Sequence, residues 1–176
     1  MTRQRLFLAL WPPAAVQETL AQHARGALQP PGRLLQPGNI HLTLCFLGAL
    51  DAAQLARVEA AAGMIRGDAF VLKLDRFGHW PRPRVFWSAP SQTPEPLVQL
   101  VHALHAALRA EGISVDVRPF RAHVTLARKV SEYAGPVTHP TVVWPVRDFC
   151  LMESKTLPQG ARYHRLNHWS LAAAND

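Results

Sequence analysis

The sequence contains the tetrad His-x-Thr-Leu twice, at residues 41–44 and at residues 123–126. The x residue is aliphatic in both copies, and the two histidines are separated by close to half of the 176 residues. Successive residues of a strand point to opposite faces, so alternation of apolar and polar residues is typical of a half-buried strand. Each tetrad therefore predicts a strand with its leucine in a core and its histidine and threonine on an open face. The repeat predicts two similar lobes that contribute one histidine each.

The open face of these predicted strands carries groups suited to phosphoryl chemistry. An unperturbed histidine has a pKa of about 6.5, so both protonation states are available near neutrality. One of His41 and His123 could take a proton from water while the other, protonated, gives a proton to the leaving oxygen. Thr43 and Thr125 would bind the non-bridging phosphate oxygens, where charge is concentrated. A single His-x-Thr on a strand is usually only a half-exposed strand, so the functional interpretation depends on the duplication.

These residues resemble the paired motifs of the 2H phosphoesterase superfamily, and within it the RNA 2′,3′-cyclic phosphodiesterase family, also called the 2′-5′ RNA ligase-like family. The tetrads are the specific part of the resemblance. Supporting segments extend from residue 5 to about residue 171 and include residues 5–10, 39–48, 118–128 and 160–163. The resemblance implies an α+β fold of two pseudo-symmetric lobes, with antiparallel sheets facing across a central cleft and helices outside. It implies that residues 1–176 form a single domain in which the two lobes interleave.

The resemblance also implies an activity. The family hydrolyses a terminal 2′,3′-cyclic phosphate of RNA or of a nucleotide to a 2′-phosphate, without a metal or other cofactor. Its first-motif histidine donates a proton and its second accepts one, roles that fall here on His41 and His123; the chemistry of the residues alone leaves this assignment open. Thr43, Thr125 and Arg128 match the family positions that hold the phosphate.

The residues after each tetrad make the two lobes unequal. Strict alternation places Arg128 on the face opposite His123, so the strand must end or bulge near Ala127 for Arg128 to reach the phosphate. The matching position after His41 is Phe46. Cys45 shares the parity of His41, so we expect it on the cleft face, where relatives often carry lysine or arginine. A catalytic thiol at Cys45 is the less favoured interpretation.

The composition indicates which class of partner and which cellular compartment to expect. The net charge is +7 and nearly all cations are arginine, which favours a polyanionic partner such as RNA. Two cysteines give no disulfide framework and predict a reduced, cytoplasmic protein. No segment approaches the ~20 apolar residues of a membrane span, and no obligate protein partner is expected. His102 and His105 lie three apart in a predicted helix, but no carboxylate or cysteine completes a metal site there.

The remaining elements follow from periodicity and from turn residues. Strands are expected at residues 5–11, 41–48, 70–77, 85–88, 141–146, 149–153 and 163–171, with residues 113–117 a short strand or an extended link. Helices are expected from Pro12-Pro13 to about residue 28, over residues 52–65 and from residues 93–94 to Gly112. Residues 29–39, 78–84 and 129–140 are expected to be loops, and residues 157–162 a turn.

Two aromatic residues are further candidates for the cleft. Phe7 shares strand parity with Ala9 and Trp11 and could line the cleft, although an ordinary core position is the favoured interpretation. Trp80 could stack on a base, as aromatic residues do in single-strand binders, or cover the edge of the core. Neither alternative for Trp80 is favoured by the sequence.

Other functions of the same chain stay open at this level. One is reversible 2′–5′ ligation of RNA halves, in which a 5′-hydroxyl replaces water. A second is an RNA-binding module that holds a 2′-phosphate end without turnover, and a third is hydrolysis of specialised substrates such as ADP-ribose 1″,2″-cyclic phosphate. Product assays separate these alternatives.

Overall fold

The computed structural model describes residues 3–29, 32–135, 137–158 and 160–173. Eight strands form one sheet: β1 (Gln4–Leu10), β2 (Arg33–Leu34), β3 (Leu42–Leu50), β5 (Arg76–Trp80), β6 (Val85–Ala89), β7 (Val124–Arg128), β9 (Asp148–Leu157) and β10 (Gly160–Ser170). Their order is β10-β9-β1-β3-β7-β6-β5, with β2 paired to β7, and each of these pairings is antiparallel. A separate antiparallel pair joins β4 (Phe70–Leu74) to β8 (Val142–Val146). The predicted α+β class with antiparallel sheets is confirmed.

The two motif strands are neighbours at the middle of the large sheet. A single register pair, Leu42 opposite Val124, joins β3 to β7, and both side chains are fully buried. The pair separates β10-β9-β1-β3 from β7-β6-β5. Because β9 pairs with β1, the C-terminal strands complete the lobe that the N-terminal strands begin. The two walls of the predicted cleft are therefore continuous through this junction.

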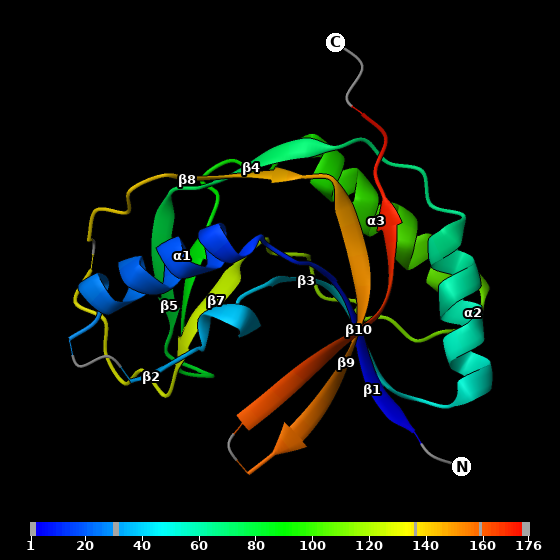
Figure 1. The fold of residues 1–176 in the computed structure, drawn as a ribbon, viewed down its shortest axis with the longest axis horizontal. Coiled ribbons are helices and arrows are strands. Elements are labelled where there is room, and N and C mark those ends of the chain that lie inside the picture. Colours follow the sequence, from blue (N-terminus) through cyan, green and yellow to red (C-terminus); the bar gives the residue numbers. More distant parts are fainter. Residues whose placement is uncertain (1–2, 30–31, 136, 159, 174–176) are drawn as a thin grey trace.

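Three helices cover the sheet: α1 (Ala14–Ala27), α2 (Ala52–Gly63) and α3 (Glu95–Ala110). Helix α1 packs on β7 and β8, whereas α2 packs on α3 and these two helices contact β10 and β3. Figure 1 shows α1 on one side of the molecule and the α2–α3 pair on the other. Asp51 caps α2 in a capping box with Gln54, as its position before the apolar stripe predicts. No helix among the described residues is long and apolar enough to cross a membrane.

Strand β1 separates two apolar clusters. Leu6, Leu8 and Leu10 face the main core, which also takes the buried sides of all the helices. Phe7 and Ala9 point to the other face, where they join a small cluster with partly buried Trp11 and Tyr163. The predicted parity of Phe7, Ala9 and Trp11 is thus confirmed, and this second face carries the motif histidines.

Equivalent β-bulges follow the two tetrads. Across β1 and β3, Ala9 faces Thr43 and Leu8 faces Cys45, so Leu44 is the extra residue. Across β6 and β7, Trp87 faces Thr125 and Phe86 faces Ala127, so Leu126 is the extra residue. A bulge of this kind leaves one residue unpaired and reverses the alternation beyond it. The two lobes therefore have the same backbone irregularity at the fourth residue of the tetrad.

Several predicted boundaries were wrong around turns. Residues 70–77 are not one strand, because β4 ends at Leu74 and Asp75 accepts hydrogen bonds from the backbone and hydroxyl of Ser91 before β5 begins. Residues 78–80 belong to β5, so the predicted loop at 78–84 is reduced to a hairpin turn of residues 81–84. The first motif strand passes Gly48, whose φ of +74° accompanies a second bulge, and ends at Leu50.

The C-terminal hairpin is also longer than periodicity predicted. Strand β9 continues to Leu157 and β10 begins at Gly160, so the predicted turn at 157–162 was wrong except near residue 158. Residue 159 lies outside the described residues. The predicted loop at 29–39 contains β2 and a 3-10 helix at Pro37–Asn39, while its residues 30–31 are not described. Residues 113–117 have no strand pairing, so they are a link and not a short strand.

Candidate active site

The β3–β7 junction brings the two His–Thr pairs together. Because the strands are antiparallel, one step from the Leu42–Val124 pair sets His41 across from Thr125 and Thr43 across from His123. All four polar side chains lie on the face opposite the buried Leu42 and Val124, and each is half-buried. Each histidine thus immediately precedes the first residue of its strand, and both lie on the same face of the sheet.

Hydrogen bonds set the same tautomer in both imidazoles. Nδ1 of His41 lies 2.7 Å from the carbonyl oxygen of Asn39, and Nδ1 of His123 lies 2.7 Å from that of Arg121. A carbonyl can only accept, so Nδ1–H donates in each case. In the neutral rings Nε2 is left unprotonated, able to accept a proton. In the protonated rings Nε2–H is the proton that can be donated.

Aromatic rings enclose His41. Trp11 stacks on it with centroids 4.9 Å apart and planes 6° apart. Phe7 and Tyr163 approach it at 5.1 Å each, Tyr163 edge-on. This enclosure shields part of the half-buried ring from water. Burial is the main cause that lowers the pKa of His41 from 6.5 to about 4; the hydrogen bond to the Asn39 carbonyl opposes it, and the charges of Arg128 and His123 add to it.

His123 has a different neighbour. Trp80 meets it in a T-shaped contact with centroids 4.6 Å apart. Burial, and then the positive charge of Arg128, lower the pKa of His123, opposed by its hydrogen bond to the Arg121 carbonyl. The positive charge of Arg128 therefore contributes to the lowered pKa of both imidazoles.

The bulge at Leu126 explains the direction of Arg128. Leu126 and Ala127 are both buried, whereas Arg128 is exposed. The condition inferred from the sequence, a bulge near Ala127, is therefore met. The equivalent bulge at Leu44 places Phe46 at the matching position of the first lobe, where its side chain is 63% exposed.

The bulge at Leu44 shows that the prediction for Cys45 was wrong. The sequence placed this thiol on the cleft face by strict alternation, but the extra residue at Leu44 turns it into the main core, where it is 4% exposed. Burial raises the pKa of the Cys45 thiol to about 12. Cys45 therefore does not line the site, and the thiol form that burial favours is a poor nucleophile.

The aromatic candidates both lie at the site. Phe7 is 3% exposed, so it is a packed residue as favoured, but its packing partner is His41. Trp80 contacts His123. Trp11 and Tyr163 were not identified as site residues, although the strand parity that Trp11 shares with Phe7 was a usable signal. Tyr163 belongs to the segment 160–163 that supports the family resemblance, but no local pattern placed it at the site, because it reaches His41 through the pairing of β10 with β9.

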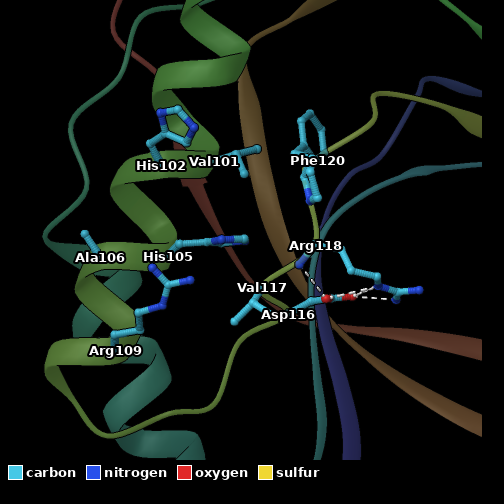
Figure 2. A pocket seen from close by; sticks show the side chains of 10 residues that line it. Val101, His102, His105, Ala106, Arg109, Asp116, Val117, Arg118 and Phe120 are labelled. Carbon is cyan, nitrogen blue, oxygen red and sulfur yellow. Dashed lines mark hydrogen bonds and ion pairs between the residues drawn. The ribbon is translucent and has the colours of Figure 1, made fainter.

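Two cavities flank this region. One, of about 440 Å³, opens beside His123 and is lined in part by Trp80 and Arg121. The other, of about 340 Å³, lies between α3 and residues 116–120 and contains His102 and His105 (Figure 2). No group of three or more His, Cys, Asp or Glu side chains within the described ranges is placed to hold a metal ion.

Comparisons with known proteins agree with this geometry. The profile of the LigT-like phosphoesterases matches twice, at residues 10–87 and 88–163, so each match contains one tetrad. The RNA 2′,3′-cyclic phosphodiesterase of Escherichia coli K12 is 38% identical over 172 residues, covering 96% of this chain and 97% of that protein. The crystal structure of E. coli LigT in the apo form superimposes with a TM-score of 0.89 at 34% identity, covering 98% of this chain and 99% of that one.

A further crystal structure, E. coli LigT complexed with 3′-AMP, has a TM-score of 0.86 at 36% identity and covers 96% of this chain and 98% of that one. The two matched halves, the near-complete coverage and the shared fold all lead to one assignment. The chain belongs to the LigT-like phosphoesterase family of the 2H superfamily.

Proposed function

We propose that this protein is an RNA 2′,3′-cyclic phosphodiesterase, which hydrolyses a terminal 2′,3′-cyclic phosphate and leaves a 2′-phosphate. The observation that carries the proposal is the Leu42–Val124 pair, which sets two His–Thr pairs side by side on one sheet face. The name of the E. coli relative supports the reaction, and the E. coli complex with 3′-AMP supports a nucleotide ligand. The end of an RNA strand or a cyclic nucleotide is the substrate.

The chemistry needs one proton acceptor and one proton donor. Nε2 of His123 takes a proton from water as the water oxygen bonds to phosphorus. Nε2–H of His41 gives its proton to the 3′-oxygen as the P–O3′ bond breaks, so the phosphate stays on O2′. The turnover ends with His123 protonated and His41 neutral, and proton exchange with solvent restores the starting state.

The lowered pKa values fit the acceptor directly and put a condition on the donor. A pKa lowered by burial keeps His123 neutral at pH 7, as a base requires. His41, with a pKa of about 4 in the free protein, must gain its proton when the anionic cyclic phosphate enters, because a nearby negative charge favours the imidazolium. The face of Trp11 is a cation–π surface for that imidazolium.

The remaining polar groups hold the phosphate. The hydroxyl of Thr43 lies across from His123 and that of Thr125 lies across from His41. Arg128 adds a positive charge, which lowers the pKa of both histidines. These groups stabilise the charge that develops on the non-bridging oxygens. Phe7 positions His41, and Trp80 is a candidate surface for a base.

The proposal extends to organisation and location. Residues 1–176 act as one catalytic domain, because the first lobe is completed by the C-terminal strands and neither lobe alone holds both histidines. A cytoplasmic location is supported by the two cysteines, which are free and buried. No protein partner is needed for the reaction.

Turnover of 2′,3′-cyclic AMP by EDTA-treated protein tests the proposal. The expected product is 2′-AMP, and His41→Ala or His123→Ala should each lower kcat/KM by about 10²–10⁴-fold. A 3′-monophosphate product, or full turnover in either variant, would contradict the proposed chemistry. Incubation with RNA halves that end in a cyclic phosphate and a 5′-hydroxyl, assayed for a 2′–5′ linkage, distinguishes ligation from hydrolysis.

A further inference from the structure

The cavity beside His123 is lined by two arginines that the proposed phosphate site does not use. Arg76 and Arg121 both line it and both are exposed. Within the described part of the chain, neither makes an ion pair with a carboxylate. A cyclic mononucleotide brings one phosphate, which the proposed site holds with the histidines, threonines and Arg128. Two further arginines beside this site fit a second phosphate, which an RNA strand supplies because it carries one phosphate per nucleotide.

The same cavity has an aromatic wall. Trp80, Trp87 and Phe120 line it. The ring of Trp80 lies 5.4 Å from that of Trp87 on one side and 4.6 Å from that of His123 on the other. The aromatic wall thus begins at a motif histidine and leads away from it. Bases of single-stranded RNA stack on such side chains with little regard to sequence.

A close backbone approach holds this wall in place. Gly78 is the cross-strand partner of Trp87, and a Cβ on Gly78 would lie 2.1 Å from Cη2 of Trp87. Only glycine allows the indole to lie against the neighbouring strand in this way. The guanidinium of Arg76 lies over the indole ring, 5.7 Å from its centroid. Arg76 and Trp87 therefore form one continuous surface of the cavity.

The second cavity lacks these features. It lies on the other side of Phe120, which lines both cavities, and neither motif histidine lines it. Arg118, on its wall, is paired with Asp116 at 2.5 Å (Figure 2), so its charge is already compensated. His102, His105 and Arg109 of α3 also line this second cavity. Of these two cavities, the one that His123 lines is therefore the one that contains Arg76 and Arg121.

We propose that the cavity lined by Arg76, Trp80, Trp87, Phe120 and Arg121 binds the nucleotide that precedes the cyclic phosphate end, so that the preferred substrate is an RNA strand. The arginines hold the phosphodiester of that nucleotide and the aromatic wall holds its base. This inference rests on the proposed function of the neighbouring site.

The test compares a dinucleotide that ends in a 2′,3′-cyclic phosphate with 2′,3′-cyclic AMP. We expect the wild-type kcat/KM to be at least about tenfold higher for the dinucleotide, the scale of one hydrogen bond to a charged group. Arg76→Gln and Arg121→Gln should each reduce this ratio about fivefold or more, and the effect should weaken in high salt. Arg109→Gln, an exposed arginine of the second cavity, is the matched control and should leave the ratio unchanged.

Failure of this inference is separable from failure of the proposed function. Turnover of both substrates at a ratio near one, or a ratio that neither Arg76→Gln nor Arg121→Gln changes, overturns the subsite and leaves the phosphodiesterase standing. Binding is measured in parallel, with a dinucleotide ending in a 2′-phosphate against 2′-AMP. Tighter binding of the dinucleotide that is lost in the variants supports the subsite even if no turnover occurs, and equal binding of the two overturns it.

Discussion

Trp11 lies face to face with His41, with ring planes 6° apart, whereas Trp80 meets His123 edge-on, with planes 70° apart. The two tetrads, which differ only in their aliphatic second residue, are thus placed in different aromatic surroundings. The pKa of His41 falls to about 4 chiefly through burial, and Trp11 covers one whole face of that ring. The histidine proposed as the acid is therefore the one whose charged form has a π surface, and the one that most needs the substrate's charge.

Replacing Trp11 by alanine should raise the pKa of His41. The change admits water to the ring, and relief of burial outweighs the lost cation–π contact because burial is the largest cause of the lowered pKa. NMR titration of the His41 Cε1 proton should show a midpoint moved from about 4 toward 6.5. Trp80→Ala is the matched control and should move the titration of His123 instead. An unchanged His41 midpoint in Trp11→Ala would show that Trp11 does not shield the ring.

Arg128→Gln should slow turnover and move the pH dependence. Loss of a charged hydrogen bond to phosphate predicts a fall in kcat/KM of about 10–100-fold. The charge of Arg128 lowers the pKa of both motif histidines, so its removal should shift both titrations upward. Lys73→Gln, an exposed change on the separate β4–β8 sheet, should do neither. A loss of activity with both titrations unmoved would place the guanidinium away from the histidines.

Cys45→Ala should leave activity within about twofold of the wild type, since the thiol lies in the core and has no access to the phosphate. The free energy of unfolding should fall by about 1 kcal/mol, as for other small deletions in a core. Thr43→Val, a change of similar volume two residues earlier on the opposite face, should show the reverse: kcat/KM lower by about tenfold and stability nearly unchanged. Loss of turnover in Cys45→Ala at unchanged stability would restore the thiol to the site.

Stability should decline in acid as His41 is forced to protonate. Its pKa in the folded state is about 4, below its ordinary value of 6.5, so between these values the unfolded chain binds more protons than the folded one. The contribution is therefore complete above pH 6.5 and is lost as pH falls toward 4. Urea unfolding at pH 7 and pH 4.5 should show a smaller loss in His41→Asn than in the wild type. The same change at exposed His164 should not reduce the loss.

The sequence predicted most of the elements that depend on neighbours along the chain, although several boundaries at turns were wrong. The duplicated tetrads identified His41 and His123, and the alternation around Leu42 correctly assigned the core and open faces up to Thr43. Capping by Asp51 and the proline start of α1 were visible because helix ends depend on a few adjacent residues. The roles of the individual site residues remain predictions that the experiments above address.

Tertiary structure decided what pairing between distant strands controls. Alternation alone put Cys45 in the cleft, but the bulge at Leu44 exists only because β1 pairs there with β3, and it exchanges the positions of Cys45 and Phe46. The side-chain period of a strand is two, so one unpaired residue reverses every later side chain. The contact of Tyr163 with His41 likewise depends on a hairpin more than a hundred residues away in sequence. Local periodicity depends only on the residues of one segment, whereas the register between two strands is determined only when the strands pair.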